Sequence, residues 1–77
     1  MFPFTREVTI DRIACPLHVI ELKKAFHTIN QNEVLKVLTG SENVSHELIS
    51  ACRALGHELK EEITGDRPAL YLLKRAV

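Results

Sequence analysis

A cysteine followed directly by a proline, with a histidine two residues further on, is the part of this chain best suited to chemistry. The segment reads Ala14-Cys15-Pro16-Leu17-His18. Proline is favoured at the first position of a helix, where its missing N–H is not needed, so we expect Cys15 at the N-cap. A thiol there faces unpaired backbone N–H groups and the positive end of the helix dipole, which favour the thiolate. Cys15 is therefore a candidate nucleophile.

Two basic side chains flank Cys15 at a distance of three residues, Arg12 before it and His18 after it. With Cys15 as N-cap, His18 takes the third helical position, from which a side chain can reach back toward the cap. An imidazolium close to the sulfur stabilises a thiolate, and Arg12 adds a second positive charge if it turns toward the same loop. We expect Cys15 and His18 to act together, supported by Pro16 and Arg12; the alternative for His18 is an ordinary solvated histidine.

The other cysteine and the other histidines are expected to be structural. Cys52 lies on the apolar stripe of a predicted helix, where it should behave as a small core residue that resists alkylation. The chain has no Cys-x-x-Cys pair, and no histidine spacing joins the others to Cys15. The sequence therefore predicts no metal site, no disulfide and no cofactor. The histidines concerned are His27, His46 and His57.

Size and composition limit the classes of function. The 77 residues make one domain, spanning 1–77, without room for a separate catalytic domain. Ten Lys and Arg balance ten Asp and Glu, so the basic stripe of a nucleic-acid binder is missing. No signal peptide is recognisable, and no segment is long enough to span a bilayer. We expect a cytoplasmic protein that contacts neither nucleic acid nor membrane directly.

Apolar periodicity predicts the elements that position this motif, strands where it has a period of two and helices where it follows three- and four-residue steps. The predicted strands span 7–11, 33–39, 57–64 and 69–74, and the predicted helices span 16–29 and 41–56. In the third strand, Leu59, Glu61 and Ile63 are expected on one face. The order β-α-β-α-β-β predicts an α+β fold, a two-layer α/β sandwich whose mixed four-stranded sheet carries both helices on one face.

Helices on one face leave the other face of the sheet bare. Apolar side chains in the second strand point to both faces, since Val34 and Leu38 alternate with Leu35 and Val37. An exposed apolar sheet face would suit docking of a partner or of a second copy. The alternative is that these residues are scattered among lysines and have no role.

Several segments resemble the small sulfur carriers of the TusA/SirA type. Besides Cys15-Pro16, they are Leu22-Lys23-Lys24-Ala25-Phe26, Asn32 to Leu38, Ala54 to Glu58, and Leu70 to Arg75. The resemblance covers roughly residues 8–75 and implies the same two-layer fold. The family motif is Cys-Pro-x-Pro, so His18 stands at the place of its second proline. Thr9 and Arg12 stand where the family tends to carry Asp and Gly.

The resemblance implies a sulfurtransferase-type carrier. Cys15 would accept sulfane sulfur as a persulfide from a donor such as a cysteine desulfurase and pass it to an acceptor protein, in transfer-RNA thiolation or related sulfur metabolism. Lys23 and Lys24 would belong to a recognition patch, or else form only a solvated helix face.

The changed motif favours an alternative of another class, a non-catalytic binding or regulatory module of the same fold. Such a module would hold an anionic ligand or a partner protein at the helix N-terminus with Arg12 and His18. A third alternative, an RNA-contacting domain, rests on fold analogy alone, and the neutral charge opposes it.

Overall fold

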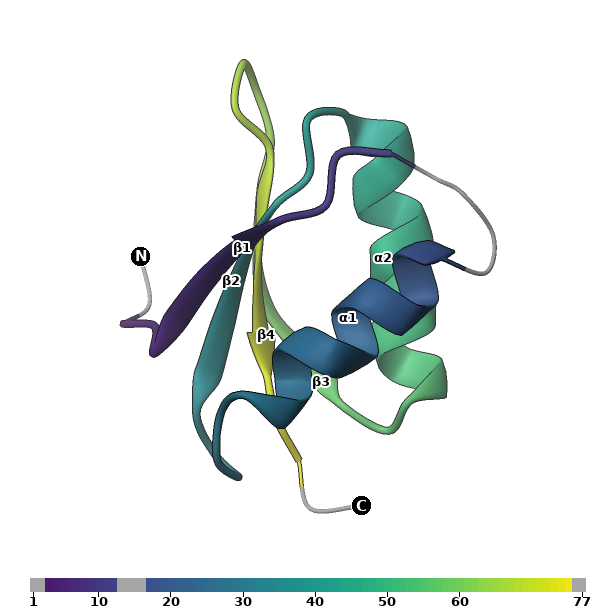
Figure 1. Ribbon diagram of the computed structural model, residues 1–77. Coiled ribbons are helices and arrows are strands. Elements are labelled where there is room, and N and C mark those ends of the chain that lie inside the picture. Colours follow the sequence, from purple (N-terminus) through teal and green to yellow (C-terminus); the bar gives the residue numbers. More distant parts are fainter. Residues whose placement is uncertain (1–2, 13–16, 76–77) are drawn as a thin grey trace.

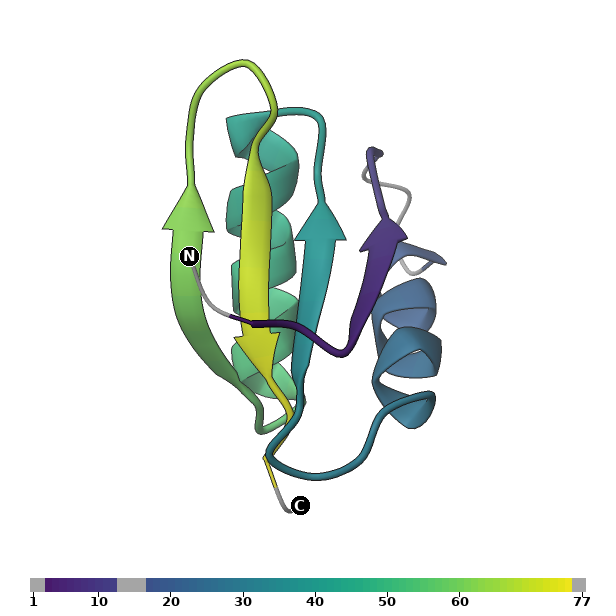
Figure 2. The same ribbon diagram turned by 90° about the vertical axis from the view of Figure 1, so that its left-hand side faces the viewer.

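The computed structural model describes residues 3–12 and 17–75, which alternate strands and helices in the predicted order (Figure 1). The elements are β1 (Arg6–Thr9), α1 (Leu17–His27), β2 (Val34–Leu38), α2 (Glu42–Ala54), β3 (Glu58–Ile63) and β4 (Ala69–Leu73). The strands form one sheet in the order β1-β2-β4-β3, in which β1 is parallel to β2 and the other neighbours are antiparallel. Both helices lie behind this sheet in Figure 2, which confirms the predicted fold class.

Helix α2 is capped at both ends by residues of the types that favour helix ends. Ser41 is the N-cap, and its Oγ accepts a hydrogen bond of 3.3 Å from the N–H of Val44. After the last turn, Gly56 donates its N–H to the carbonyl of Arg53 at 3.0 Å. Gly56 has a φ of 87°, which a residue without a Cβ adopts without strain. An N-cap of this kind contributes about 1 kcal/mol, and the Gly56 turn directs the chain into β3.

Helix α1 ends at His27, two residues before the predicted end at Ile29. The N–H groups of Thr28 and Ile29 donate to carbonyls only three residues back, at 3.1 and 3.3 Å, so the last turn is tightened. Thr28 Oγ1 also donates to the carbonyl of Ala25 at 2.6 Å, which competes with the regular helical pattern. Neither helix in the described ranges is long and apolar enough to cross a membrane.

The hydrophobic core lies between the helices and one face of the sheet. The helices contribute apolar residues at three- and four-residue spacing, and β2 and β4 contribute alternate residues. The core residues without any exposed surface are Leu22, Leu35, Val37, Leu48, Cys52, Leu70 and Leu72. Burying a side chain of this size contributes roughly 1.5–3 kcal/mol, so the pattern of apolar residues is enough to place both helices on the sheet.

Strand β3 departs from the predicted alternation of faces. Leu59 pairs with Leu72 and packs against the core, but Glu61 pairs with Tyr71, which lies outside the core cluster. The register shifts between these two β3 residues, because Lys60 is an extra residue at a β-bulge. A one-residue shift reverses the face of every residue after it. The prediction that Leu59 and Glu61 share one face was therefore wrong.

The sheet face away from the helices is not bare at its centre. Residues 3–5 cross this face in front of β4 and β2 (Figure 2). The Phe4 ring lies against Tyr71, with centroids 6.2 Å apart, and Lys36 Nζ lies 5.1 Å from the Phe4 centroid and 3.3 Å from the Glu7 carboxylate. Tyr71 is fully buried as a result. The expectation of a bare face was thus wrong at its centre, where the chain's own N-terminal segment covers it.

Candidate functional site

The motif that the sequence singles out is described on both sides of its cysteine. Cys15 and Pro16 lie outside the described residues, so the N-cap position of Cys15 stays a prediction. Arg12 is exposed and follows β1, while His18 lies in the first turn of α1. These two residues show where the chain enters and leaves the motif.

A cleft of about 280 Å³ lies between the end of β1 and the start of α1. One wall consists of residues 9–12 and the other of the first residues of α1. Arg12 and His18 both line it, so the structure brings together the two basic groups that the sequence predicts for the site. The carboxylates of Asp11 and Glu21 line it as well, and these were not predicted. Glu21 follows His18 by three residues, and this spacing, which puts two residues on one helix face, could have revealed it.

His18 is buried rather than solvated. Only 5% of its surface is exposed, and it continues the core-facing stripe of α1 one turn before Leu22. Within the described ranges its Nδ1 has no hydrogen-bond partner. An unpaired buried polar atom costs about 1–3 kcal/mol, and in a natural protein such an atom calls for an explanation. His18 is among the residues that line the cleft, although the nitrogen itself is buried.

The charges along α1 favour an anion at its start. The first turn of α1 contains no acidic residue, while Lys24 and His27 occupy the last turn. The helix dipole is positive at the start and negative at the end, so the basic residues complement the end and the start keeps its positive potential. The dipole favours a thiolate or another anion there, while the carboxylates of Asp11 and Glu21 in the lining of the same cleft oppose it.

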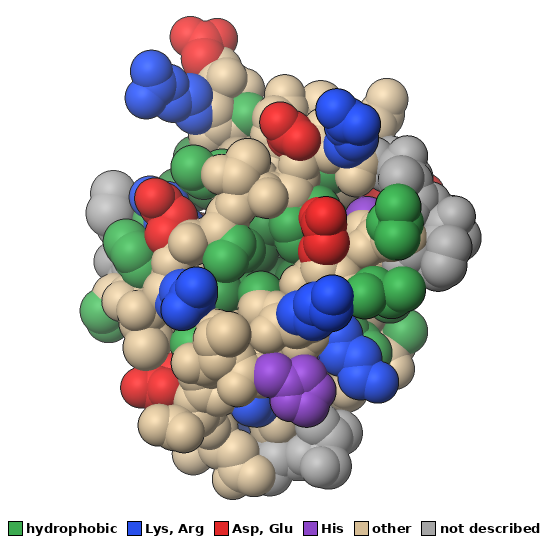
Figure 3. All heavy atoms as spheres, in the orientation of Figure 1, with side chains coloured by type: hydrophobic (Ala, Val, Ile, Leu, Met, Phe, Trp, Pro, Cys, Tyr) green, Lys and Arg blue, Asp and Glu red, His purple; other side chains and the backbone are tan. Residues whose placement is uncertain are grey.

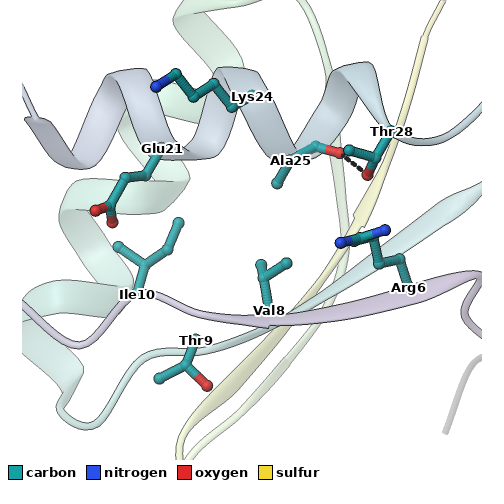
Figure 4. Close-up of a pocket in the computed structure, with 8 residues that line it drawn as sticks. All are labelled: Arg6, Val8, Thr9, Ile10, Glu21, Lys24, Ala25 and Thr28. Atoms are coloured by element: carbon teal, nitrogen blue, oxygen red, sulfur yellow. Dashed lines mark hydrogen bonds between the residues drawn. The ribbon is translucent and has the colours of Figure 1, made fainter.

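A second hollow, of about 330 Å³, adjoins the cleft between β1 and α1 (Figure 4). Val8 of β1 and Ile10, which follows β1, point into it, Ala25 and Glu21 point into it from α1, and Thr9 points away. The hollow and the cleft share three lining residues, Thr9, Ile10 and Glu21. A groove with an apolar floor therefore leads along the edge strand toward the motif.

The loop after β2 supports the chain that leads into the motif. The N–H of Ile10 donates to the carbonyl of Leu38 at 2.9 Å, which extends the pairing beyond β1. Gly40 has a φ of 78°, and a Cβ added there would lie 3.1 Å from the Cβ of Asp11. The close approach of these two backbones thus depends on a residue without a side chain.

Cys52 is a core residue, as predicted. Its side chain has no exposed surface, and burial raises its pKa to about 12. It therefore stays a neutral, inert thiol at physiological pH. In the part of the chain that the structure describes, no three His, Cys, Asp or Glu side chains form a group that could hold a metal ion.

A comparison with protein families gives a match that spans most of the chain. The family model described as Sulfurtransferase TusA matches residues 8–74. The matched range contains the Cys15-Pro16 motif together with Arg12 and His18. It confirms the resemblance that the motif segments indicate.

Proposed function

The chain belongs to the TusA sulfurtransferase family, and we propose that it is a sulfur carrier in which Cys15 holds sulfane sulfur as a persulfide. The observation that carries the proposal is the family match across Cys15 and Pro16. The cleft adds support, because Arg12 and His18 both line it and only residues 13–16, which include Cys15, join Arg12 to α1. Among the described residues the buried His18 Nδ1 has no hydrogen-bond partner.

The proposed transfer has two half-reactions of the same kind. The Cys15 thiolate attacks the outer sulfur of a persulfide on the donor, so that a new S–S bond forms on Cys15. The S–S bond of the donor breaks, its electron pair leaves on the donor thiolate, and the persulfide proton stays with the transferred sulfur. An acceptor thiolate then attacks the outer sulfur on Cys15 and releases the Cys15 thiolate. The exchange involves no net oxidation and requires no cofactor.

We assign supporting roles to the residues around the cysteine. The charge of Arg12 and the imidazole of His18 would stabilise the Cys15 thiolate. Pro16 would set the helix start at which the thiolate is stabilised. His18 occupies the place of the second proline of the family motif, and it adds an imidazole that a proline does not offer.

A carrier of this kind works between two partners. Proteins of the TusA family generally interact with sulfur-transfer partners, and we propose a cysteine desulfurase as the donor. The acceptor would be a protein of transfer-RNA thiolation or related sulfur metabolism. We assign the relay to the cytoplasm, where thiols are kept reduced.

Intact-mass spectrometry tests the carrier function. The protein is incubated with a cysteine desulfurase and cysteine, and one added sulfur atom per chain is expected. Cys15→Ser should gain none, while Cys52→Ser serves as the matched control and should gain one. Equal sulfur uptake by wild type and Cys15→Ser would contradict the proposal.

The second candidate is a binding module that holds an anionic ligand. It is favoured because Arg12 and His18 line one cleft and His18 Nδ1 has no hydrogen-bond partner among residues 3–12 and 17–75. A phosphate or flavin mononucleotide could satisfy this nitrogen at the helix start. Titration of the protein with both anions, followed by NMR at the Leu17 and His18 amides, distinguishes the candidates. Saturable shifts, together with no sulfur uptake on Cys15, would favour the module over the carrier.

A further inference from the structure

A basic groove of about 350 Å³ opens beside the C-terminal half of α1. Its lining has no acidic side chain among the described residues, and its five basic groups come from three parts of the chain. They are Lys23 and His27 of α1, His57 before β3, and Lys74 and Arg75 after β4. Figure 3 shows Lys, Arg and His side chains close together over α1, in the lower part of the view. Because the whole chain is neutral, this groove is a local concentration of positive charge.

Hydrogen bonds hold two of the basic groups in place. His57 Nδ1 accepts a bond of 3.1 Å from the N–H of Arg75, so neutral His57 carries its proton on Nε2. The His57 ring packs on Phe26, with centroids 4.0 Å apart. Lys74 Nζ donates to the carbonyl of Ile29 at 2.8 Å, which fixes this ammonium group beside the end of α1.

The positive charge of the groove is only partly neutralised within the chain. Arg75 lies 3.4 Å from the Glu58 carboxylate, but both side chains are about half exposed and such a pair is worth only about 0–1 kcal/mol. Lys74 is paired with a carbonyl rather than a carboxylate. Lys23 is exposed and has no ion pair in the described ranges. The pKa of His57 is lowered by burial and by the charge of Lys74, which agrees with a surplus of positive charge.

We infer that this groove binds a carboxylate-rich segment of a partner protein that visits the sulfur-transfer motif. At 1.5 Å per residue, the eleven residues of α1 span about 16 Å, so the groove and the motif lie toward opposite ends of the helix. A small anion in the groove would not reach the motif, whereas a protein can cover both. Nucleic acids require an extended basic stripe, and these five groups form only one local cluster. The groove is therefore unsuited to a nucleic acid. That the visitor is a sulfur donor or acceptor rests on the proposed function.

Two neighbouring lysines provide a matched pair of variants. Lys23 lines the basic groove, whereas Lys24 lines the hollow between β1 and α1 instead. Both are exposed residues of the same helix. Lys23→Ala and Lys24→Ala therefore remove the same charge one residue apart, but only the first removes it from the groove.

Hexaglutamate titrated into the ¹⁵N-labelled Cys15→Ser protein tests the inference, since this variant cannot carry sulfur. Side-chain signals of His27 and His57 are expected to shift in a saturable manner, and affinity should fall as salt is added. Lys23→Ala should weaken binding about two- to fivefold, as expected for one rim charge, while Lys24→Ala leaves it unchanged.

Several outcomes would overturn the inference. These are an absence of shifts at millimolar peptide, an equal loss of affinity in both lysine variants, tighter binding of a six-nucleotide single strand, or full displacement by inorganic phosphate at equal concentration. Binding of the peptide without sulfur uptake by Cys15 in the wild type would instead refute the carrier function alone. Sulfur uptake without peptide binding would refute the groove alone.

Discussion

Replacing His18 with leucine is expected to stabilise the fold and to slow sulfur uptake at the same time. His18 is 5% exposed, and in the described ranges its Nδ1 has no partner. Leucine fills a similar volume without a polar atom, which removes a cost of about 1–3 kcal/mol. Imperfect packing of the new side chain offsets part of this gain. We expect a net gain of about 1 kcal/mol, or roughly 4–8 °C in Tm for a domain of this size.

Two assays on the same variants measure both effects. Urea unfolding and thermal melting give the stability, and the rate of sulfur uptake from a cysteine desulfurase gives the function. His18→Leu should be more stable than wild type and should load Cys15 more slowly. Leu22→Ala is the control from the same helix stripe, and as an ordinary core truncation it should lose about 2–5 kcal/mol.

Either of two results would refute this reasoning. If His18→Leu is less stable than wild type by 1 kcal/mol or more, roughly the size of the expected gain, the nitrogen is satisfied in the native protein. If the variant is more stable but takes up sulfur at the wild-type rate, the buried imidazole has no part in the chemistry.

Three further predictions follow from the structure. Burial and the charge of Lys74 lower the pKa of His57 from 6.5, so protonation of His57 opposes folding. As the pH falls from about 7.5 to 5.5, urea unfolding should show that wild type loses more stability than His57→Gln. Equal losses in the two proteins would contradict this. Gly40→Ala should lower the free energy of unfolding by about 1–2 kcal/mol through its positive φ and its contact with Asp11, and an unchanged Tm would argue against that strain. Cys52 should resist iodoacetamide in the native protein and react in urea, so native labelling there would disprove its burial.

Most of the fold could be predicted because each element carries a clear apolar period. The apolar stripe of α2 led to a predicted range of 41–56, whose ends lie within two residues of those in the structure. The bulge at Lys60 could not be predicted, since an extra residue in a strand leaves no mark in an alternating polar segment. The contact of Phe4 with Tyr71 was not predicted, because the two residues lie far apart in the sequence.

The residues of the site could be predicted where they lie close together in the sequence. Arg12 and His18 line one cleft as the motif suggests, and the burial of His18 could have been read from its position four residues before Leu22. The basic groove was out of reach, because His57 and Arg75 meet there only after β3 pairs with β4. Contacts of this kind depend on the register of the sheet.

The most direct test of the carrier function follows labelled sulfur to a single residue. The protein is incubated with a cysteine desulfurase and ³⁵S-cysteine, digested without reductant, and the peptides are separated. The label should be found on the peptide that contains Cys15, and dithiothreitol should release it. Label on the Cys52 peptide, or on no peptide at all while the desulfurase is active, would contradict the account.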